Sequence, residues 1–124
     1  MSLSVSLVFK IDTGGVDYEC EVYSFNITHN LGRMALECGL YNPMWRPYRM
    51  YNIDDERGKS FIANAGELYD ALKFGVDELV ANPKKYKEMN PANGWGTYEN
   101  LVDTATEYMN ACKDFPEAGV KVDR

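Results

Sequence analysis

The chain has 124 residues, a formal net charge of −6 and a pI near 4.7. Its length suits one domain over residues 1–124, and its composition of 45% hydrophobic and 26% charged residues is typical of a globular protein. The acidic charge argues against generic binding to nucleic acids and anionic membranes, because both are polyanions. No apolar run reaches the ~18 residues of a membrane span, and no secretory leader is recognised, so we expect a cytoplasmic protein.

The N-terminal segment predicts a β-hairpin. Apolar and polar residues alternate over residues 3–11, with the period of two that a half-buried strand requires. Gly14 and Gly15 then suit a tight turn. A second alternation places Tyr18, Cys20 and Val22 on one face and acidic residues on the other. Residues 119–122 are a candidate third strand at the edge of this hairpin.

The period changes to that of a helix after residue 26. Either Asn26 or Thr28 suits the cap of the first helix, and Gly39 suits its end. Residues 40–63 are expected to be irregular, apart from a short strand over residues 60–63.

Two further helices follow. Asn64 and Glu67 resemble a capping box at the start of the second helix, which Pro83 interrupts before a further short turn. Thr97 is the expected cap of the last helix, which ends near Phe115. These elements predict an α+β fold in which the hairpin, joined by the C-terminal strand, packs on three main helices.

The cysteines predict neither disulfides nor a metal site. Cys20, Cys38 and Cys112 are odd in number and widely spaced, which favours reduced thiols over a disulfide framework. Zinc usually requires paired ligands two to four residues apart, and this chain has no such pair. We therefore expect no metal and no cofactor.

Every histidine-based mechanism would have to pass through His29, the only histidine. A general base is conceivable there, but no nucleophile or metal partner is evident, and a structural role is the more common one. No catalytic residue is therefore assigned.

Two aromatic segments are candidates for binding or for core packing. Residues 44–51 interleave aromatic residues with arginines, a combination that is common at interfaces, although Trp45 is expected to fill the core. Residues 93–98 place Trp95 between two glycines ahead of a helix, and insertion of Trp95 into the core is again the expectation.

The segments NITHNLGRMA (26–35), WRP (45–47) and PANGWGTY (91–98) together resemble a group of small uncharacterised proteins encoded in phage and prophage genomes. The resemblance covers about residues 23–124. That group has no assigned activity, so the resemblance implies a bacterial host cytosol and no reaction type. The positions that it nominates are His29, Asn30, Trp45, Arg46, Asn93 and Trp95.

Three hypotheses follow. The first is a non-enzymatic accessory protein that binds a host or phage protein. The second is a small-ligand or enzymatic site where the three segments meet, which requires a concave pocket that contains His29. Its candidate residues are Asn26, Thr28, His29, Asn30, Trp45, Arg46, Asn93, Trp95 and Tyr98. The third is mimicry of a nucleic acid by Glu99, Asp103 and Glu107, which line one face of the last helix.

Overall fold

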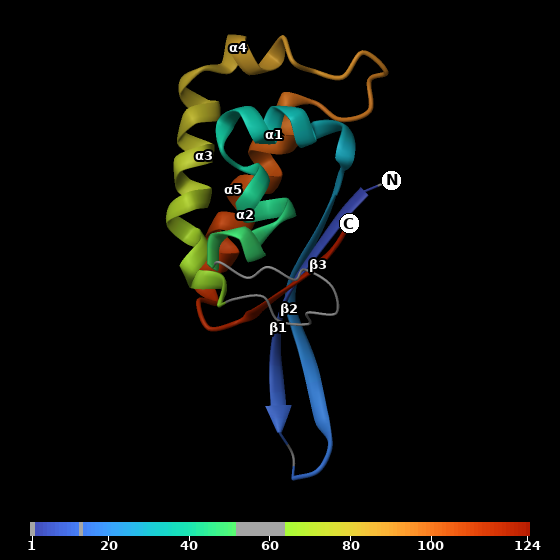
Figure 1. Cartoon of the computed structure of the whole chain (residues 1–124), viewed down its shortest axis with the longest axis vertical. Coiled ribbons are helices and arrows are strands. Elements are labelled where there is room, and N and C mark those ends of the chain that lie inside the picture. Colours follow the sequence, from blue (N-terminus) through green and yellow to red (C-terminus); the bar gives the residue numbers. More distant parts are fainter. Residues whose placement is uncertain (1, 13, 52–63) are drawn as a thin grey trace.

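The computed structural model describes residues 2–12, 14–51 and 64–124. It has an α+β fold, as the sequence predicts, in which a three-stranded antiparallel sheet of order β2-β1-β3 carries the helices on one side (Figure 1). The strands are β1 (Ser2–Asp12), β2 (Asp17–Thr28) and β3 (Gly119–Asp123). The C-terminal strand pairs with β1 over Ser4–Val8, which confirms the third strand at the hairpin edge.

The helices follow β2 in chain order. A 3₁₀ helix, His29–Leu31, leads into α1 (Gly32–Cys38). The segment expected to be irregular contains α2 (Tyr41–Trp45) and the 3₁₀ helix Pro47–Tyr51, so that expectation was wrong over this part. The strand expected over residues 60–63 lies outside the described residues.

Three more α-helices complete the helical side. A 3₁₀ turn, Ala65–Leu68, leads into α3 (Tyr69–Ala81), and α4 (Pro83–Lys87) is the short turn expected after Asn82. The last helix is α5 (Tyr98–Asp114).

The helix ends show which capping predictions hold. Thr97 and Asn100 form a capping box at the start of α5, and Thr28 accepts a hydrogen bond from the backbone N–H of Asn30 at 3.2 Å. The capping box expected at Asn64 and Glu67 is absent, because Asn64 makes no side-chain capping bond. The backbone instead bridges to the start of the C-terminal strand: Asn64 pairs with Gly119, and the Ala65 N–H donates to the carbonyl of Ala118, the residue before the strand, at 2.8 Å.

A β-bulge changes the register of the hairpin. Leu7 lies opposite Tyr23 and Val8 lies opposite Glu21, so Val22 is an extra residue. Residues opposite one another share a face of the sheet, so the bulge places Tyr18 and Cys20 on the same face as the buried residues of β2. Val22 is itself half-buried and packs against the core, so it lies with Tyr18 and Cys20 on the core side, as the sequence predicts.

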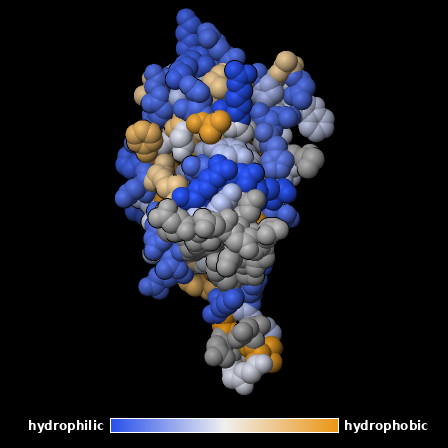
Figure 2. All heavy atoms as spheres, viewed as in Figure 1, coloured by the Kyte–Doolittle hydropathy of each residue, from blue (hydrophilic) through white to orange (hydrophobic). Residues whose placement is uncertain are grey.

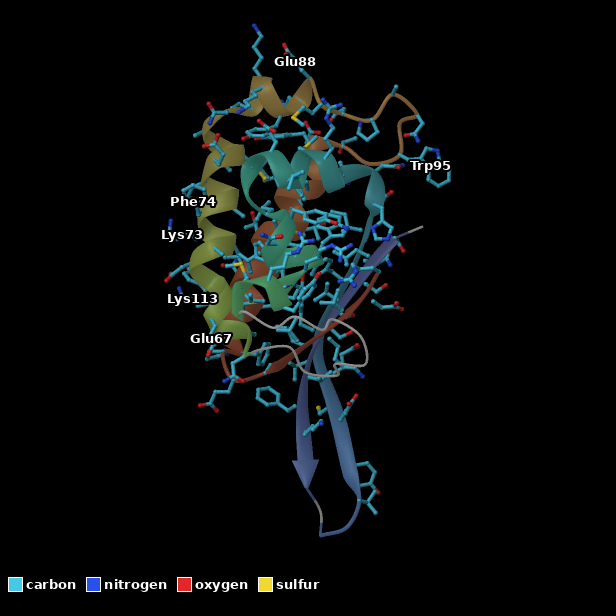
Figure 3. The ribbon with its side chains drawn as sticks, viewed as in Figure 1. Glu67, Lys73, Phe74, Glu88, Trp95 and Lys113 are labelled. Carbon is cyan, nitrogen blue, oxygen red and sulfur yellow. The ribbon has the colours of Figure 1, made fainter. Side chains whose placement is uncertain are left out.

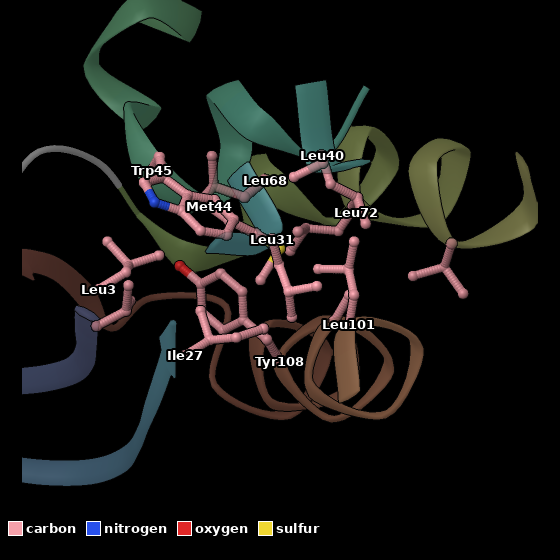
Figure 4. Close-up of a cluster of buried hydrophobic side chains, with 14 of the residues drawn as sticks. Leu3, Ile27, Leu31, Leu40, Met44, Trp45, Leu68, Leu72, Leu101 and Tyr108 are labelled. Atoms are coloured by element: carbon pink, nitrogen blue, oxygen red, sulfur yellow. The ribbon is translucent and has the colours of Figure 1, made fainter. Parts of the chain in front are cut away.

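The core lies between the sheet and the helices. Side chains from β1 and β2 meet those from α2, α3 and α5 in one continuous cluster (Figure 4). Gly75 of α3 allows a close approach to Leu40, since a Cβ at residue 75 would lie 2.5 Å from Leu40 Cγ. The labelled side chains of this cluster are Leu3, Ile27, Leu31, Leu40, Met44, Trp45, Leu68, Leu72, Leu101 and Tyr108.

The hairpin extends beyond the helical body as a two-stranded arm (Figure 1). Ile11 and Tyr18 continue on the arm the apolar face that is buried elsewhere, and they are 47% and 56% exposed. Val16, in the connection between the two strands, is 55% exposed. Figure 2 shows hydrophobic residues at the protruding end.

Candidate functional site

Residues far apart in the sequence meet beside the end of β2. The 3₁₀ turn after β2 lies against the loop that joins α4 to α5, and the side-chain amide of Asn30 donates to the Trp95 carbonyl at 3.4 Å. A hollow of about 570 Å³, called the first hollow below, lies between them. Its lining residues are Ser2, Asn26, Thr28, His29, Asn30 and Trp95.

A second hollow, of about 330 Å³, lies on the side of α2. His29 lines both hollows, so it is half-buried between them and not sealed in the core. The second hollow is lined by His29, Gly32, Tyr41, Trp45, Arg46 and Arg124.

The strand end that supports the first hollow is held by side-chain hydrogen bonds. The amide nitrogen of Asn26 donates to the hydroxyls of Ser2 and Ser4 at 2.9 and 2.8 Å, which ties β2 to the start of β1. Asn26 therefore belongs to the strand and does not cap the helix. Its side-chain oxygen accepts no hydrogen bond from the described residues, which leaves it able to accept one from a ligand.

The loop that carries Trp95 has a defined shape. Its backbone turns at Asn93, whose side-chain oxygen accepts from the Trp95 N–H at 3.0 Å. Gly96 has a φ of +99°, and a Cβ there would lie 2.7 Å from Thr28 Cγ2, so only glycine lets the loop lie against the end of β2. The Trp95 loop is thus fixed to the end of β2, where Asn26 and Thr28 line the hollow.

Trp95 is 70% exposed, so the expectation that it inserts into the core was wrong. Its side chain projects outward from the loop (Figure 3). The contact of Gly96 with Thr28 and Leu31 leaves Trp95 at the rim of the hollow, and an indole in that position can stack on a ligand.

Trp45 is 2% exposed and fills the core, as expected. Its indole Nε1 donates a hydrogen bond to Nδ1 of His29 at 3.0 Å. Because Nδ1 accepts, the neutral imidazole carries its hydrogen on Nε2 and presents a donor there.

Arg46 lies in the wall of the second hollow. Its Nε donates to the Tyr41 hydroxyl and its guanidinium NH1 to the Tyr48 hydroxyl, both at 3.2 Å. Arg124 reaches the same wall from the C-terminal strand and donates to the Trp45 carbonyl at 3.2 Å. These bonds position both guanidinium groups against the aromatic side chains of α2 and of the turn that follows it.

Of the remaining predicted residues, Asn93 shapes the Trp95 loop, and Tyr98 lies in the core. The Tyr98 hydroxyl donates to the Leu79 carbonyl at 2.6 Å, and Tyr98 lines neither hollow. Sequence reasoning missed Ser2, Gly32, Tyr41 and Arg124. No local signal marks Ser2 and Arg124, since the strands bring both ends of the chain to the site.

The chemistry available at His29 is hydrogen bonding. Within residues 2–12, 14–51 and 64–124, the imidazole has one hydrogen-bond partner, the indole of Trp45. No hydroxyl or thiol of this part of the chain is bonded to the ring, so the geometry contains no nucleophile and base pair.

The described residues include no group of three or more His, Cys, Asp and Glu side chains that could hold a metal ion. No helix among them is both long enough and apolar enough to cross a bilayer.

Comparisons of this chain with protein-family models, with curated proteins and with solved structures give no match. The resemblance to phage and prophage proteins therefore stays a prediction that these comparisons do not test.

Proposed function

We propose that the protein is a non-catalytic binding protein whose ligand enters the first hollow. The observation that carries this proposal is the convergence of two distant segments, in which Asn30 and Trp95 are joined by a hydrogen bond at 3.4 Å. Polar side chains grouped around a concave surface, with an aromatic residue at its rim, are characteristic of ligand sites. The sequence hypothesis of a small-ligand or enzymatic site requires a concave pocket that contains His29. The absence of a nucleophile bonded to His29 among the described residues favours its ligand-binding form.

The test is an NMR titration of the ¹⁵N-labelled protein with a library of small polar fragments. We expect some fragments to shift the resonances of Asn26, Asn30 and Trp95 together. The variant Asn30→Ala removes the amide that holds the Trp95 loop and should weaken those fragments. Phe74→Ala, which changes an exposed residue of α3, is the matched control. Fragments that bind only elsewhere, or that bind equally well to Asn30→Ala, would refute the proposal.

A second candidate function, binding to a host or phage protein, is favoured by the arm of the hairpin. Exposed apolar side chains on a protruding element are common at protein interfaces. The protein carries a net charge of −6, so we expect the complementary partner to have an apolar surface with a basic rim.

The test of the arm compares the wild type with the triple variant Ile11→Ser, Val16→Ser, Tyr18→Ser in a crosslinked pull-down from bacterial lysate. We expect the wild type to recover a partner that the triple variant does not recover. Added salt should weaken the binding of this partner. Recovery of the same proteins by the wild type and the triple variant would exclude the arm as the binding surface.

Mimicry of a nucleic acid stays a prediction. Glu99, Asp103 and Glu107 are exposed on α5, as that hypothesis requires, but the Lys87 ammonium lies 3.7 Å from the Glu99 carboxylate. A basic group within the acidic face reduces its likeness to a row of phosphates.

A further inference from the structure

We infer that the first hollow binds a neutral, polyhydroxylated ligand, a mono- or disaccharide, with one face of a sugar ring stacked on Trp95. This inference rests on the proposed function and names the chemical class of its ligand. It follows from the charge, the hydrogen-bonding groups and the shape of the hollow.

The described lining of the hollow consists of polar and aromatic side chains. Among the described residues, none that lines it is an acid, a lysine or an arginine. The arginines of this region, Arg46 and Arg124, line the second hollow. A phosphate or carboxylate would lose hydration in the first hollow and gain no opposite charge, so a neutral ligand suits it better.

The hydrogen-bonding groups of the hollow are a mixture of donors and acceptors. The Asn26 amide donates both of its hydrogens to serine hydroxyls of β1, so its side-chain oxygen is left for a ligand. Asn30 donates one hydrogen to Trp95 and keeps its oxygen and a second N–H. The bond from Trp45 leaves Nε2 as the donor of the neutral His29 ring, which lines the hollow. Ligand hydroxyls both donate and accept, so a ring with several hydroxyls matches such a set.

The rim supplies an apolar surface for the ring itself. A sugar ring has faces made of C–H groups, and these pack on the electron-rich face of an indole. Trp95 is 70% exposed, and its loop is already fixed by Asn93, Asn30 and the contact of Gly96 with Thr28, so binding orders little additional chain. The hollow of about 570 Å³ falls within the range of roughly 300–1,000 Å³ for small-molecule sites.

A nucleoside is the main rival ligand, because a flat base also stacks on an indole. The hollow has one exposed aromatic residue at its rim and polar groups of both kinds along its wall. A sugar ring can stack on the aromatic rim and form hydrogen bonds with the polar wall through hydroxyls all around it. The base of a nucleoside can stack as well, but it presents polar atoms only at its edges.

The experiment is a titration of the ¹⁵N-labelled protein with glucose, galactose, mannose, N-acetylglucosamine and their disaccharides, and separately with adenosine and inorganic phosphate. We expect at least one sugar to shift Asn26, Asn30 and the Trp95 indole N–H, and phosphate to shift none of them. Trp95→Ala should weaken that sugar about tenfold or more, and Trp95→Phe, which keeps an aromatic face, should weaken it less. Phe74→Ala should leave the affinity unchanged.

The outcomes separate this inference from the proposed function. If adenosine or other fragments bind at Trp95 and no sugar does, the ligand class is wrong while the hollow is still a binding site. If neither sugars nor fragments perturb the hollow, both proposals fail. A sugar that binds with equal affinity to the wild type and to Trp95→Ala also overturns the inference, since stacking on Trp95 is its central contact.

Discussion

The indole Nε1 of Trp45 donates a hydrogen bond to Nδ1 of His29 at 3.0 Å, so a core side chain sets the tautomer of the residue between the two hollows. The two rings are tilted by 45° with centroids 6.5 Å apart, and Tyr41 stacks on the same indole with centroids 5.6 Å apart. His29 is therefore oriented by the core while its side chain lines both hollows.

Trp45→Phe should release His29. The variant removes the donor to Nδ1 and part of the buried volume, so we expect the free energy of unfolding to fall by about 2 kcal/mol. Long-range ¹H–¹⁵N NMR spectra should show Nδ1 without hydrogen in the wild type and a mixture of tautomers in the variant. Trp95→Phe is the control, since its exposed indole should change stability by less than about 0.5 kcal/mol. An unaltered imidazole spectrum in Trp45→Phe would contradict this view.

Gly96→Ala should destabilise the protein more than Gly14→Ala does. Both glycines have positive φ, +99° and +78°, so both substitutions strain the backbone by about 1 kcal/mol or more. Only at residue 96 would the new Cβ meet atoms, 2.7 Å from Thr28 Cγ2 and 3.0 Å from Leu31 Cγ. We expect urea denaturation to show about 1–2 kcal/mol of additional loss for Gly96→Ala. Equal losses would mean that the loop does not depend on this contact.

Gly75→Ala should reverse the usual effect of removing a glycine from a helix. Alanine normally stabilises a helix interior by about 0.5–1 kcal/mol, but here its Cβ would lie 2.5 Å from both Cγ and Cδ2 of Leu40. We expect a net loss of about 1–3 kcal/mol in denaturation experiments. At Gly32, the first residue of α1, the nearest atom to a new Cβ is Tyr41 Cε2 at 3.8 Å, so Gly32→Ala should be neutral or stabilising. A stabilised Gly75→Ala would show that α3 can move away from Leu40.

The cysteines should differ in reactivity. Burial raises the pKa of Cys38 to about 11 and that of Cys112 to about 12, while Cys20 is exposed on the arm. A raised pKa lowers the fraction of reactive thiolate, and burial blocks access as well, so iodoacetamide at pH 8 should modify Cys20 first. Mass spectrometry should find one adduct on the native protein and three after denaturation. Rapid modification of Cys112 in the native protein would contradict its burial.

Much of the fold could be predicted because the burial of one face of a strand or helix makes apolar residues recur in the sequence at a fixed spacing. Residues 3–11 alternate with a period of two, and the apolar stripe of α5 recurs with the period of a helix, so both elements were recognised. The bulge at Val22 was not predicted, because no residue type there marks an extra position in the strand. Its effect reaches Tyr18 and Cys20, since the change of parity decides which face they share.

The site was harder to predict than the elements. The two tryptophans have the same side chain and lie in loop-like sequence, and the core was expected for both. Trp95 lies outside the core because Gly96 packs against Thr28, a residue 68 positions earlier, and a local pattern cannot show such a contact. Asn26, Thr28, His29 and Asn30 were found as one polar segment, whereas their meeting with Trp95 follows only from the tertiary structure.

The short C-terminal strand divides the sheet into a three-stranded part and a less stable two-stranded part. β3 pairs with β1 only as far as Val8, and beyond it the arm has two strands, tied to the body by the ion pair of Lys121 and Glu19 at 2.8 Å and the edge contact of Phe9 with Phe115. A two-stranded hairpin is marginally stable by itself. Amide hydrogens near the end of the arm should therefore exchange by local opening while those of Val5 and Leu7 await global unfolding. The arm can thus change its conformation with little effect on the rest of the protein.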